Sequence, residues 1–365
     1  MGIMNMEKIK KFLIVDFSKR LTLGDQLKIM FEILFVSWFL FTLVYIVVLI
    51  RGAGKTDTPS SAEVSQVQTS EVSKEQSSAQ PVEQSSDVSE TQSTQETNGV
   101  FDETETIIAE RSEMYAGDMI LVNKQYPCHH DGEETVSLMG VKTDSYMVTD
   151  YNVSLNESII ENLNQWLDDF RDNYGESDVM IACGYRSRSN QEEIFNNEVD
   201  DVGEEEAVKW VAKPGYSEHQ TGYVIDFTLY DSEEYGSIKY DGTGTYEWIN
   251  ENCYKYGFIL RYPLGKEEIT GYSYEPWHFR YVGYPAAYYI MQNNLTLEEY
   301  IELVKKHDIN APLLIDAGGE DKWYCYYIPA SDGQTQLTVP KYGNYKISGD
   351  NFSGFIITAD VDIKG

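Results

Sequence analysis

The sequence has few cysteines and few basic residues. Its four cysteines, Cys128, Cys183, Cys253 and Cys325, are scattered and form no CxxC pair, which excludes a disulfide scaffold and a structural zinc knuckle. One or two disulfide bonds outside the cell and free buried thiols both remain open. The 28 Lys and Arg against 60 Asp and Glu give a net charge of −32. This balance excludes nucleic acid as a partner, because phosphates need a basic face, and it excludes attachment to anionic lipid through charge alone. An acidic excess does keep a secreted domain soluble.

Aromatic residues are absent from residues 53–100, where Ser, Thr, Gln, Glu and Val dominate. Such a segment cannot bury enough apolar surface to offset the entropy lost on ordering. We therefore expect residues 51–109 to form a disordered linker, whose reach lets a folded domain sample a layer above the membrane.

The longest apolar run, residues 33–50, reads ILFVSWFLFTLVYIVVLI and carries no charge over 18 residues. Its length is near the lower limit for a span, which needs about 20 residues. It is too long for the core of a signal peptide, and no small-residue cleavage site follows it. Lys and Arg are more frequent before it than after it. The sequence thus predicts a cytoplasmic segment at 1–32, a single-pass membrane anchor at 33–50 and an extracytoplasmic remainder, localised to the cell membrane.

From residue 110 the composition is that of a folded domain. Six apolar residues share one helical face, with Ser154 and Glu157 as a capping box at its start; they are Leu155, Ile159, Leu163, Trp166, Leu167 and Phe170. Further helices are expected at 191–197, at 246–256 before Gly257, and at 297–307 after a Thr296–Glu299 capping box. Strands are expected at 179–182, 223–230 and 277–282. This order predicts an α+β domain over residues 110–315, followed by a small β appendage at 316–365.

Two of the five histidines lie in segments with several polar and charged side chains that could serve as ligands or catalytic groups. The first segment runs from Pro214 to Asp226 and contains His219. Side chains alternate along a strand, so Ile225 and Phe227 should enter the core while Asp226 points the other way. A carboxylate within an apolar strand is costly unless it is paired or bound to a cation.

The second segment is Glu275-Pro-Trp-His278, which continues as a strand. Pro276 forces Glu275 into an extended conformation. Two histidines and one carboxylate are a common ligand set for catalytic zinc, with the fourth position left to water. A nearby carboxylate can then accept the proton of that water. We therefore predict zinc on His219, Asp226 and His278.

Three ordered motifs resemble those of the VanY-type D-alanyl-D-alanine carboxypeptidases. Ser217 to Asp226 resembles their SxHxxGxxxD signature, Glu275 to His278 their ExxWH signature, and the segment from Cys183 to Ser187 their SGYRS segment. The match covers about residues 150–290. It implies the zinc-peptidase fold shared with lysostaphin-like enzymes and the hedgehog signalling domain, a small antiparallel sheet flanked by helices with zinc in the groove.

The resemblance also implies roles for individual residues. His219, Asp226 and His278 become the zinc ligands, Glu275 the general base and later the acid, and Arg186 the cation beside the scissile carbonyl. Ser217 and Gln191 become substrate contacts. Cys183 departs from the usual serine, and Tyr223-Val-Ile-Asp226 departs from the commoner Leu-Ala-Val-Asp, without touching a ligand.

The resemblance implies an enzyme that cleaves D-alanine from peptidoglycan stem peptides. We also expect the chain to be a monomer. Two alternatives stay open, an L,D-carboxypeptidase that acts on tetrapeptide stems and a zinc-bearing cell-wall binding module that does not hydrolyse. Retention of Glu275 favours the enzyme. A serine or cysteine hydrolase is disfavoured, since no GxSxG elbow is present. The cluster Cys128-His129-His130 is a weak metal candidate, because adjacent histidines point apart in a strand or helix.

Overall fold

The computed structural model describes residues 100–131 and 134–361, which belong to one compact unit, Thr91–Gly365. The predicted anchor at 33–50 lies outside these residues, as does the predicted linker up to residue 99. Among the helices that the structure describes, none is long and apolar enough to cross a membrane.

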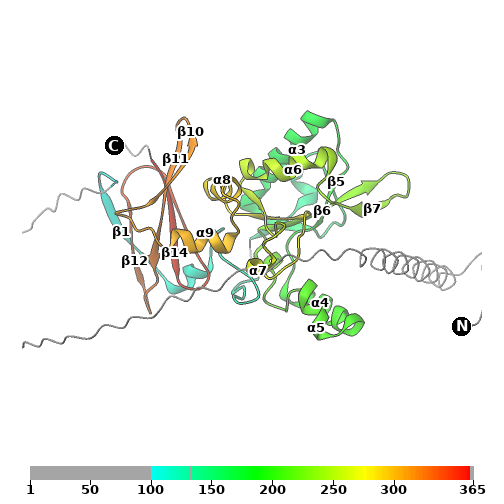
Figure 1. The fold of residues 1–365 in the computed structure, drawn as a ribbon, viewed down its shortest axis with the longest axis horizontal. Helices are drawn as coiled ribbons and strands as arrows, with labels where there is room; N and C mark the ends of the chain where they lie inside the picture. The colour runs from blue at the N-terminus through cyan, green and yellow to red at the C-terminus, as the bar shows by residue number, and fades with distance from the viewer. Residues whose placement is uncertain (1–99, 132–133, 362–365) are drawn as a thin grey trace, which may run out of the picture. The chain divides into compact units, whose positions relative to one another are not determined.

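The central sheet of this unit has the strand order β3-β5-β6-β9-β8, and β7 pairs with β6 (Figure 1). Its strands are β3 (Met147–Val148), β5 (Val179–Cys183), β6 (Val224–Asp231), β7 (Gly236–Lys239), β8 (Phe258–Leu260) and β9 (His278–Tyr281). Only β3 with β5 is a parallel pair; the other neighbours are antiparallel. The predicted α+β class is confirmed, with one parallel pair added to the expected antiparallel sheet.

Helix α3 (Ile160–Tyr174) packs its apolar stripe on one face of this sheet. Trp166 is fully buried, and its ring lies 5.0–5.4 Å from those of Phe227, Phe258 and Phe279. Ile225 and Phe227 are buried as the alternation in β6 predicts. The opposite face of β6 is therefore the one that carries Asp226.

The predicted start of this helix is wrong. Ser154 and Leu155 belong to strand β4 (Ser154–Asn156), which pairs with β2 (Thr135–Ser137). A 3-10 turn, η3 (Glu157–Ile159), then leads into α3, and the side chain of Asn156 caps it by accepting from the Ser158 N–H. Strand pairing with a segment about 20 residues earlier thus overrides the local capping-box pattern.

Other predicted elements are present with shifted ends. Helix α4 (Arg188–Val202) is longer than expected and leads into α5 (Glu204–Trp210). Helix α6 (Glu247–Asn252) continues as a 3-10 turn, η6 (Cys253–Tyr256), that ends at Gly257 with φ 82°. Helix α9 (Leu297–Val304) begins with the predicted Thr296–Glu299 capping box. Two further helices are the short α7 (Glu267–Thr270) and α8 (Tyr284–Gln292).

The C-terminal segment forms a second sheet with the order β10-β11-β14-β13, so the expected β appendage is present. Its strands are β10 (Leu313–Gly318), β11 (Asp321–Pro329), β13 (Tyr345–Gly349) and β14 (Gly354–Asp360). Helices α8 and α9 lie between the two sheets (Figure 1) and share an apolar core with β10, β11 and β14. The second sheet is therefore packed on the rest of the unit rather than attached by a free linker.

Strand β1 (Thr104–Ala109) pairs antiparallel with β12 (Thr335–Pro340). The prediction that the linker extends to residue 109 is therefore wrong over 104–109. The sequence TETIIA has no aromatic residue, as in the linker, and its first five residues are not buried, so composition alone does not mark it as a strand of the folded unit. All four cysteines are free thiols.

Candidate active site

The register of three neighbouring strands brings the predicted site residues together. Asp226 in β6 pairs with Cys183 in β5 on one side and with His278 in β9 on the other. His219 lies in the 3-10 turn η4 (Glu218–Thr221) that precedes β6. Gly222 closes this turn with φ 76°, a conformation that glycine adopts without strain. The turn folds back and places His219 beside Asp226.

The carboxylate of Asp226 lies between the two imidazoles. Its Oδ2 is 3.1 Å from Nε2 of His219, and its Oδ1 is 2.8 Å from Nδ1 of His278. The two imidazole rings meet edge to face, with their centroids 5.2 Å apart. The structure thus assembles the three predicted zinc ligands at one point.

The donor set fits a metal ion. Nδ1 of His219 lies 2.6 Å from the carbonyl oxygen of Gly184 and donates to it, which leaves the Nε2 lone pair facing Asp226. A lone pair and a carboxylate repel each other unless a cation lies with them, and ligating histidines commonly donate their other N–H to a carbonyl or carboxylate. Nε2 of His278 and Oδ1 of Asp226 are buried and have no hydrogen bond within the described residues.

Electrostatics support the same assignment. Burial alone would raise the pKa of Asp226. The nearby imidazoles of His219 and His278 lower this pKa by a larger amount, so it lies below its ordinary value. Burial lowers the pKa of His278, but the neighbouring carboxylates of Asp226, Glu218 and Glu275 together raise it by more, so the net shift is upward. The site therefore holds a carboxylate with two imidazoles that attract cationic charge, either a proton or a metal ion.

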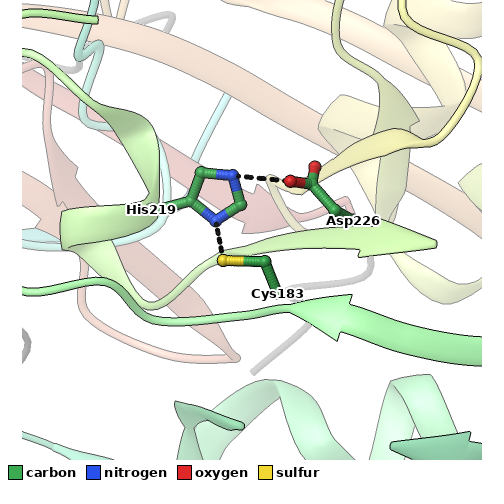
Figure 2. Close-up of side chains that lie close together, drawn as sticks. All are labelled: Cys183, His219 and Asp226. Atoms are coloured by element: carbon green, nitrogen blue, oxygen red, sulfur yellow. Dashed lines mark hydrogen bonds and ion pairs between the residues drawn. The ribbon is translucent and has the colours of Figure 1, made fainter. Parts of the chain in front are cut away.

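Cys183 lies on the other side of His219. Figure 2 shows its sulfur next to Nδ1 while Asp226 faces Nε2, and the sulfur is 3.5 Å from Nδ1. Cys183, His219 and Asp226 are close enough to form a three-residue metal group within the described residues. Because the Gly184 carbonyl occupies Nδ1, we assign the ligand role to the Nε2 side and a supporting role to Cys183.

Glu275 lies beside the proposed ligands, with its Oε2 3.6 Å from Nδ1 of His278. Burial raises the pKa of Glu275 above its ordinary value. A carboxyl group with a raised pKa next to a metal site can both accept and return a proton near neutral pH. The position of Glu275 agrees with the predicted base.

Arg186 is held in place by two neighbours. It donates from Nη1 to Oε1 of Gln191 at 2.9 Å and from Nη2 to the sulfur of Cys183 at 3.1 Å. Gln191 is buried and donates its amide to the carbonyl oxygen of Ala212. Both polar groups of Gln191 are thus used inside the protein, so its geometry favours orientation of Arg186. Its predicted contact with substrate stays a prediction, as does that of the buried Ser217.

A cavity of about 290 Å³ opens over these residues. Its polar lining includes Arg186, Ser217 and Glu275, together with the three proposed ligands. Its apolar lining consists of Ile194, Trp210, Val211, Ala212 and Trp277, with Tyr262 and Tyr272 beside them. The cavity therefore brings the three predicted ligands, the carboxyl group of Glu275 and the cation Arg186 together beside an apolar wall.

Glu218 is a functional candidate that sequence reasoning missed. It lies between Ser217 and His219, lines the same cavity and is almost fully buried. The local sequence does not mark Glu218 as functional, because its partners Arg261 and Arg280 are far away in the sequence. By contrast, the weak candidate His129 is exposed, and its ring contacts that of Tyr115 at a tilt of 32°, with ring centroids 3.9 Å apart.

Known proteins share this sequence and fold. The profile of the family "VanY: D-alanyl-D-alanine carboxypeptidase" matches residues 152–284. A D-alanyl-D-alanine carboxypeptidase of Enterococcus faecium is 31% identical over 72% of this chain and 82% of its own length. The bifunctional D-Ala-D-Ala dipeptidase and D-Ala-D-Ala carboxypeptidase VanXYC of Enterococcus gallinarum is 35% identical over 49% of this chain and 91% of its own.

The similarity extends to three dimensions. The crystal structure of the vancomycin resistance D,D-dipeptidase VanXYg, in complex with a D-Ala-D-Ala phosphinate analog, aligns with a TM-score of 0.63 and 32% identity. The alignment covers 70% of this chain and 99% of that one. Because sequence, fold and motif order all match, this chain belongs to the VanY family of D-alanyl-D-alanine carboxypeptidases.

Proposed function

We propose that the enzyme is a zinc-dependent D,D-carboxypeptidase that removes the C-terminal D-alanine from peptidoglycan stem peptides. The observation that carries this proposal is the convergence of His219 and His278 on the carboxylate of Asp226, with Glu275 beside them in one cavity. The relatives from Enterococcus faecium and Enterococcus gallinarum are named for action on D-Ala-D-Ala, which supports D,D- over L,D-cleavage.

His219, Asp226 and His278 would hold the zinc. When bound, zinc supplies a Lewis acid and makes water nucleophilic near neutral pH. The remaining chemistry belongs to side chains of this chain. Glu275 accepts a proton from the attacking water and delivers one to the nitrogen of the departing D-alanine. The same carboxyl group can serve both steps because it returns to its starting state after each turnover.

Arg186 stabilises the negative charge that develops on the oxygen of the scissile carbonyl. Its contacts with Gln191 and Cys183 fix the guanidinium before substrate arrives. A donor held in advance does not have to reorganise during the reaction. The apolar wall around Trp210 and Trp277 suits the methyl groups of two D-alanine residues and excludes water from the bond to be cleaved.

The test of this proposal compares two substrates on the full-length chain. A stem pentapeptide ending in D-Ala-D-Ala and the corresponding tetrapeptide are incubated with the enzyme, and products are identified by mass spectrometry. We expect loss of one alanine from the pentapeptide, its abolition by a chelator and its recovery on addition of zinc. Cleavage of the tetrapeptide alone would establish the L,D-alternative. Cleavage of neither by a zinc-loaded chain would favour a binding module.

The proposed location follows from the sequence. We propose that residues 33–50 anchor the chain in the cell membrane and that the catalytic unit lies on the extracytoplasmic side, where its substrate is. The excess of basic residues before the anchor supports this orientation. Protease added to intact cells should release the catalytic unit by cleavage within residues 53–100. If the catalytic unit is protected from the protease until the membrane is permeabilised, its orientation is opposite to the one proposed.

We further propose that the enzyme acts as a monomer, because one chain supplies every residue assigned to the site. Sedimentation of the purified protein at the concentration of the activity assay tests this. A dimer with activity that falls on dilution would contradict it.

A further inference from the structure

Glu218 occupies a buried position between two arginines. Its side chain is 1% exposed, and those of Arg261 and Arg280 are fully buried. Oε1 of Glu218 accepts from Nε of Arg261 at 2.8 Å and from Nη1 of Arg280 at 3.0 Å. A buried carboxylate is tolerated only where such charged donors surround it. The two arginines therefore keep Glu218 ionised and hold one of its oxygens.

The arginines are themselves fixed by other groups. Arg261 donates from both terminal nitrogens to Glu298 of α9, at 2.9 and 2.6 Å. Arg280 donates to the carbonyl oxygens of Asp118, Ile120 and Tyr281. Because these contacts come from several elements, the arginines cannot turn to follow Glu218. The carboxylate has one orientation available.

In this orientation the second oxygen of Glu218 faces a proposed metal ligand. Oε2 has no hydrogen bond within the described residues, and it lies 3.7 Å from Nε2 of His278, which also has none. Buried polar atoms are rarely left without a partner. The other nitrogen of the ring, Nδ1, faces Asp226 at 2.8 Å and Glu275 at 3.6 Å. His278 thus presents Nδ1 to the reaction site and Nε2 to Glu218.

We propose that Glu218 is a positioning residue of the metal site, which accepts the Nε2–H of His278 and so keeps the Nδ1 lone pair directed at the metal. This inference rests on the proposed zinc-dependent function. A partner on the outer nitrogen fixes the tautomer and the ring orientation of a ligating histidine. The proposal gives a role to Glu218, which stands at the unspecified position between the serine and the histidine of the SxHxxGxxxD motif.

The two arginines make the substitution Glu218→Gln informative. They require an acceptor, so the carbonyl oxygen of the introduced amide would face them and its NH₂ group would face Nε2 of His278. A donor at that place favours the tautomer with the proton on Nδ1, which cannot bind metal through Nδ1. We expect zinc affinity to fall roughly 10- to 100-fold, the usual effect of losing such a partner.

Glu298→Gln is the matched control. It removes a carboxylate from the same Arg261, with the same change in charge, but the hydrogen bonds of Glu298 are to Arg261 and Asn123. Its zinc affinity should equal that of the wild type, although its stability falls. An effect of charge or of Arg261 alone would appear equally in both variants.

The experiment uses the full-length chain with ¹⁵N-labelled histidine. Zinc dissociation constants are measured by competition with a chromophoric chelator for the wild type, Glu218→Gln and Glu298→Gln. Long-range ¹H–¹⁵N spectra of the zinc-loaded wild type locate the proton of His278, whose ring signals are assigned by correlation with its own backbone resonances. We expect this proton on Nε2. Only five histidines contribute signals.

Each outcome decides the question. Weaker zinc binding in Glu218→Gln alone, with the wild-type proton on Nε2, supports the proposal. Equal zinc affinity in all three proteins overturns it, as does a proton on Nδ1 in the wild type, and the latter holds even if Glu218→Gln does not fold. A wild-type chain that binds no zinc would instead overturn the proposed function.

Discussion

Oδ1 of Asp226 lies 2.8 Å from Nδ1 of His278, its direct partner across the ladder between β6 and β9. The same carboxylate contacts His219 through its other oxygen. One aspartate thus organises both imidazoles, and the central sheet fixes its position. Two of the proposed ligands, Asp226 and His278, are therefore held by the sheet itself, whereas His219 reaches them from the turn η4.

His278→Ala should abolish zinc binding, because two remaining ligands cannot hold the ion against a competing chelator. The measurement is zinc content per chain after dialysis against a chelator. His129→Ala is the control: this histidine is exposed and its ring contacts Tyr115, so zinc content should not change. Full zinc occupancy in His278→Ala would refute the ligand assignment.

Glu275→Gln should keep zinc and fold but lose most turnover. Glutamine retains the shape and lacks a basic site, and general acid–base catalysis contributes roughly 10²- to 10⁴-fold in rate. Turnover of a D-Ala-D-Ala peptide, zinc content and melting temperature are measured on one preparation, with the exposed Glu268→Gln as control. Residual activity above about a tenth, a loss of only about 1.4 kcal/mol, would exclude Glu275 as the base.

Arg186→Lys should lower kcat roughly 10²- to 10³-fold, the usual effect of removing one donor to a developing oxyanion. An ammonium group cannot donate to Gln191 and Cys183 and still face the substrate in the same geometry. The comparison is with Arg171→Lys on α3, where the side chain is 38% exposed. A rise in KM with kcat preserved would assign Arg186 to substrate binding instead.

Buried thiols should make the folded state less stable at alkaline pH. Burial raises the pKa of Cys325 to about 11 and that of Cys253 to about 12. Above the ordinary value of 9.0, the unfolded chain releases thiol protons that the folded chain retains. The stabilising contribution is thus complete below about pH 9 and decreases as the pH rises through about 11 and 12.

Denaturant unfolding at about pH 8, 10 and 11 measures this dependence. Cys325→Ser removes one titrating group, so its free energy of unfolding should fall less steeply between about pH 9 and 11, by up to about 1.4 kcal/mol per pH unit. Parallel curves for the variant and the wild type would show that this thiol does not contribute.

Trp166→Ala should destabilise the fold by about 3–5 kcal/mol, since a large, fully buried side chain would leave a cavity. Trp166→Phe should destabilise the fold less than Trp166→Ala. It also removes the Nε1–H group, but this group is buried without a hydrogen bond within the described residues, so no hydrogen bond is lost. Tyr151→Ala, at a side chain 78% exposed, is the reference and should stay within about 0.5 kcal/mol. Denaturant unfolding gives all three values, and equal losses for Trp166→Ala and Tyr151→Ala would contradict the packing described.

Local patterns in the sequence predicted the elements whose cause is local. Alternation along β6 correctly separated Phe227 from Asp226, and the Thr296–Glu299 capping box begins α9 as expected. The three residues predicted as ligands from distinctive motif spacing also lie together in the structure. Patterns of this kind depend on neighbours within a few residues, and so one sequence is enough to see them.

Features created by distant pairing were not predictable in the same way. Ser154 has the pattern of a helix cap until β4 pairs with β2, and residues 104–109 look like linker until β1 pairs with β12. Glu218 becomes a candidate only when the fold brings Arg261 and Arg280 to it. In each case the deciding partner lies far away in the chain, and no local rule identifies it.

The pairing of β1 with β12 has a mechanical consequence. The chain enters the described unit at β1, and the ladder from Thr104 to Ala109 joins it to a strand near the C-terminus. Tension on the preceding residues would therefore be borne first by this ladder, outside the strands that carry Asp226 and His278. With the membrane anchor proposed above, a pull on the linker would load this ladder before it loads the strands of the candidate site.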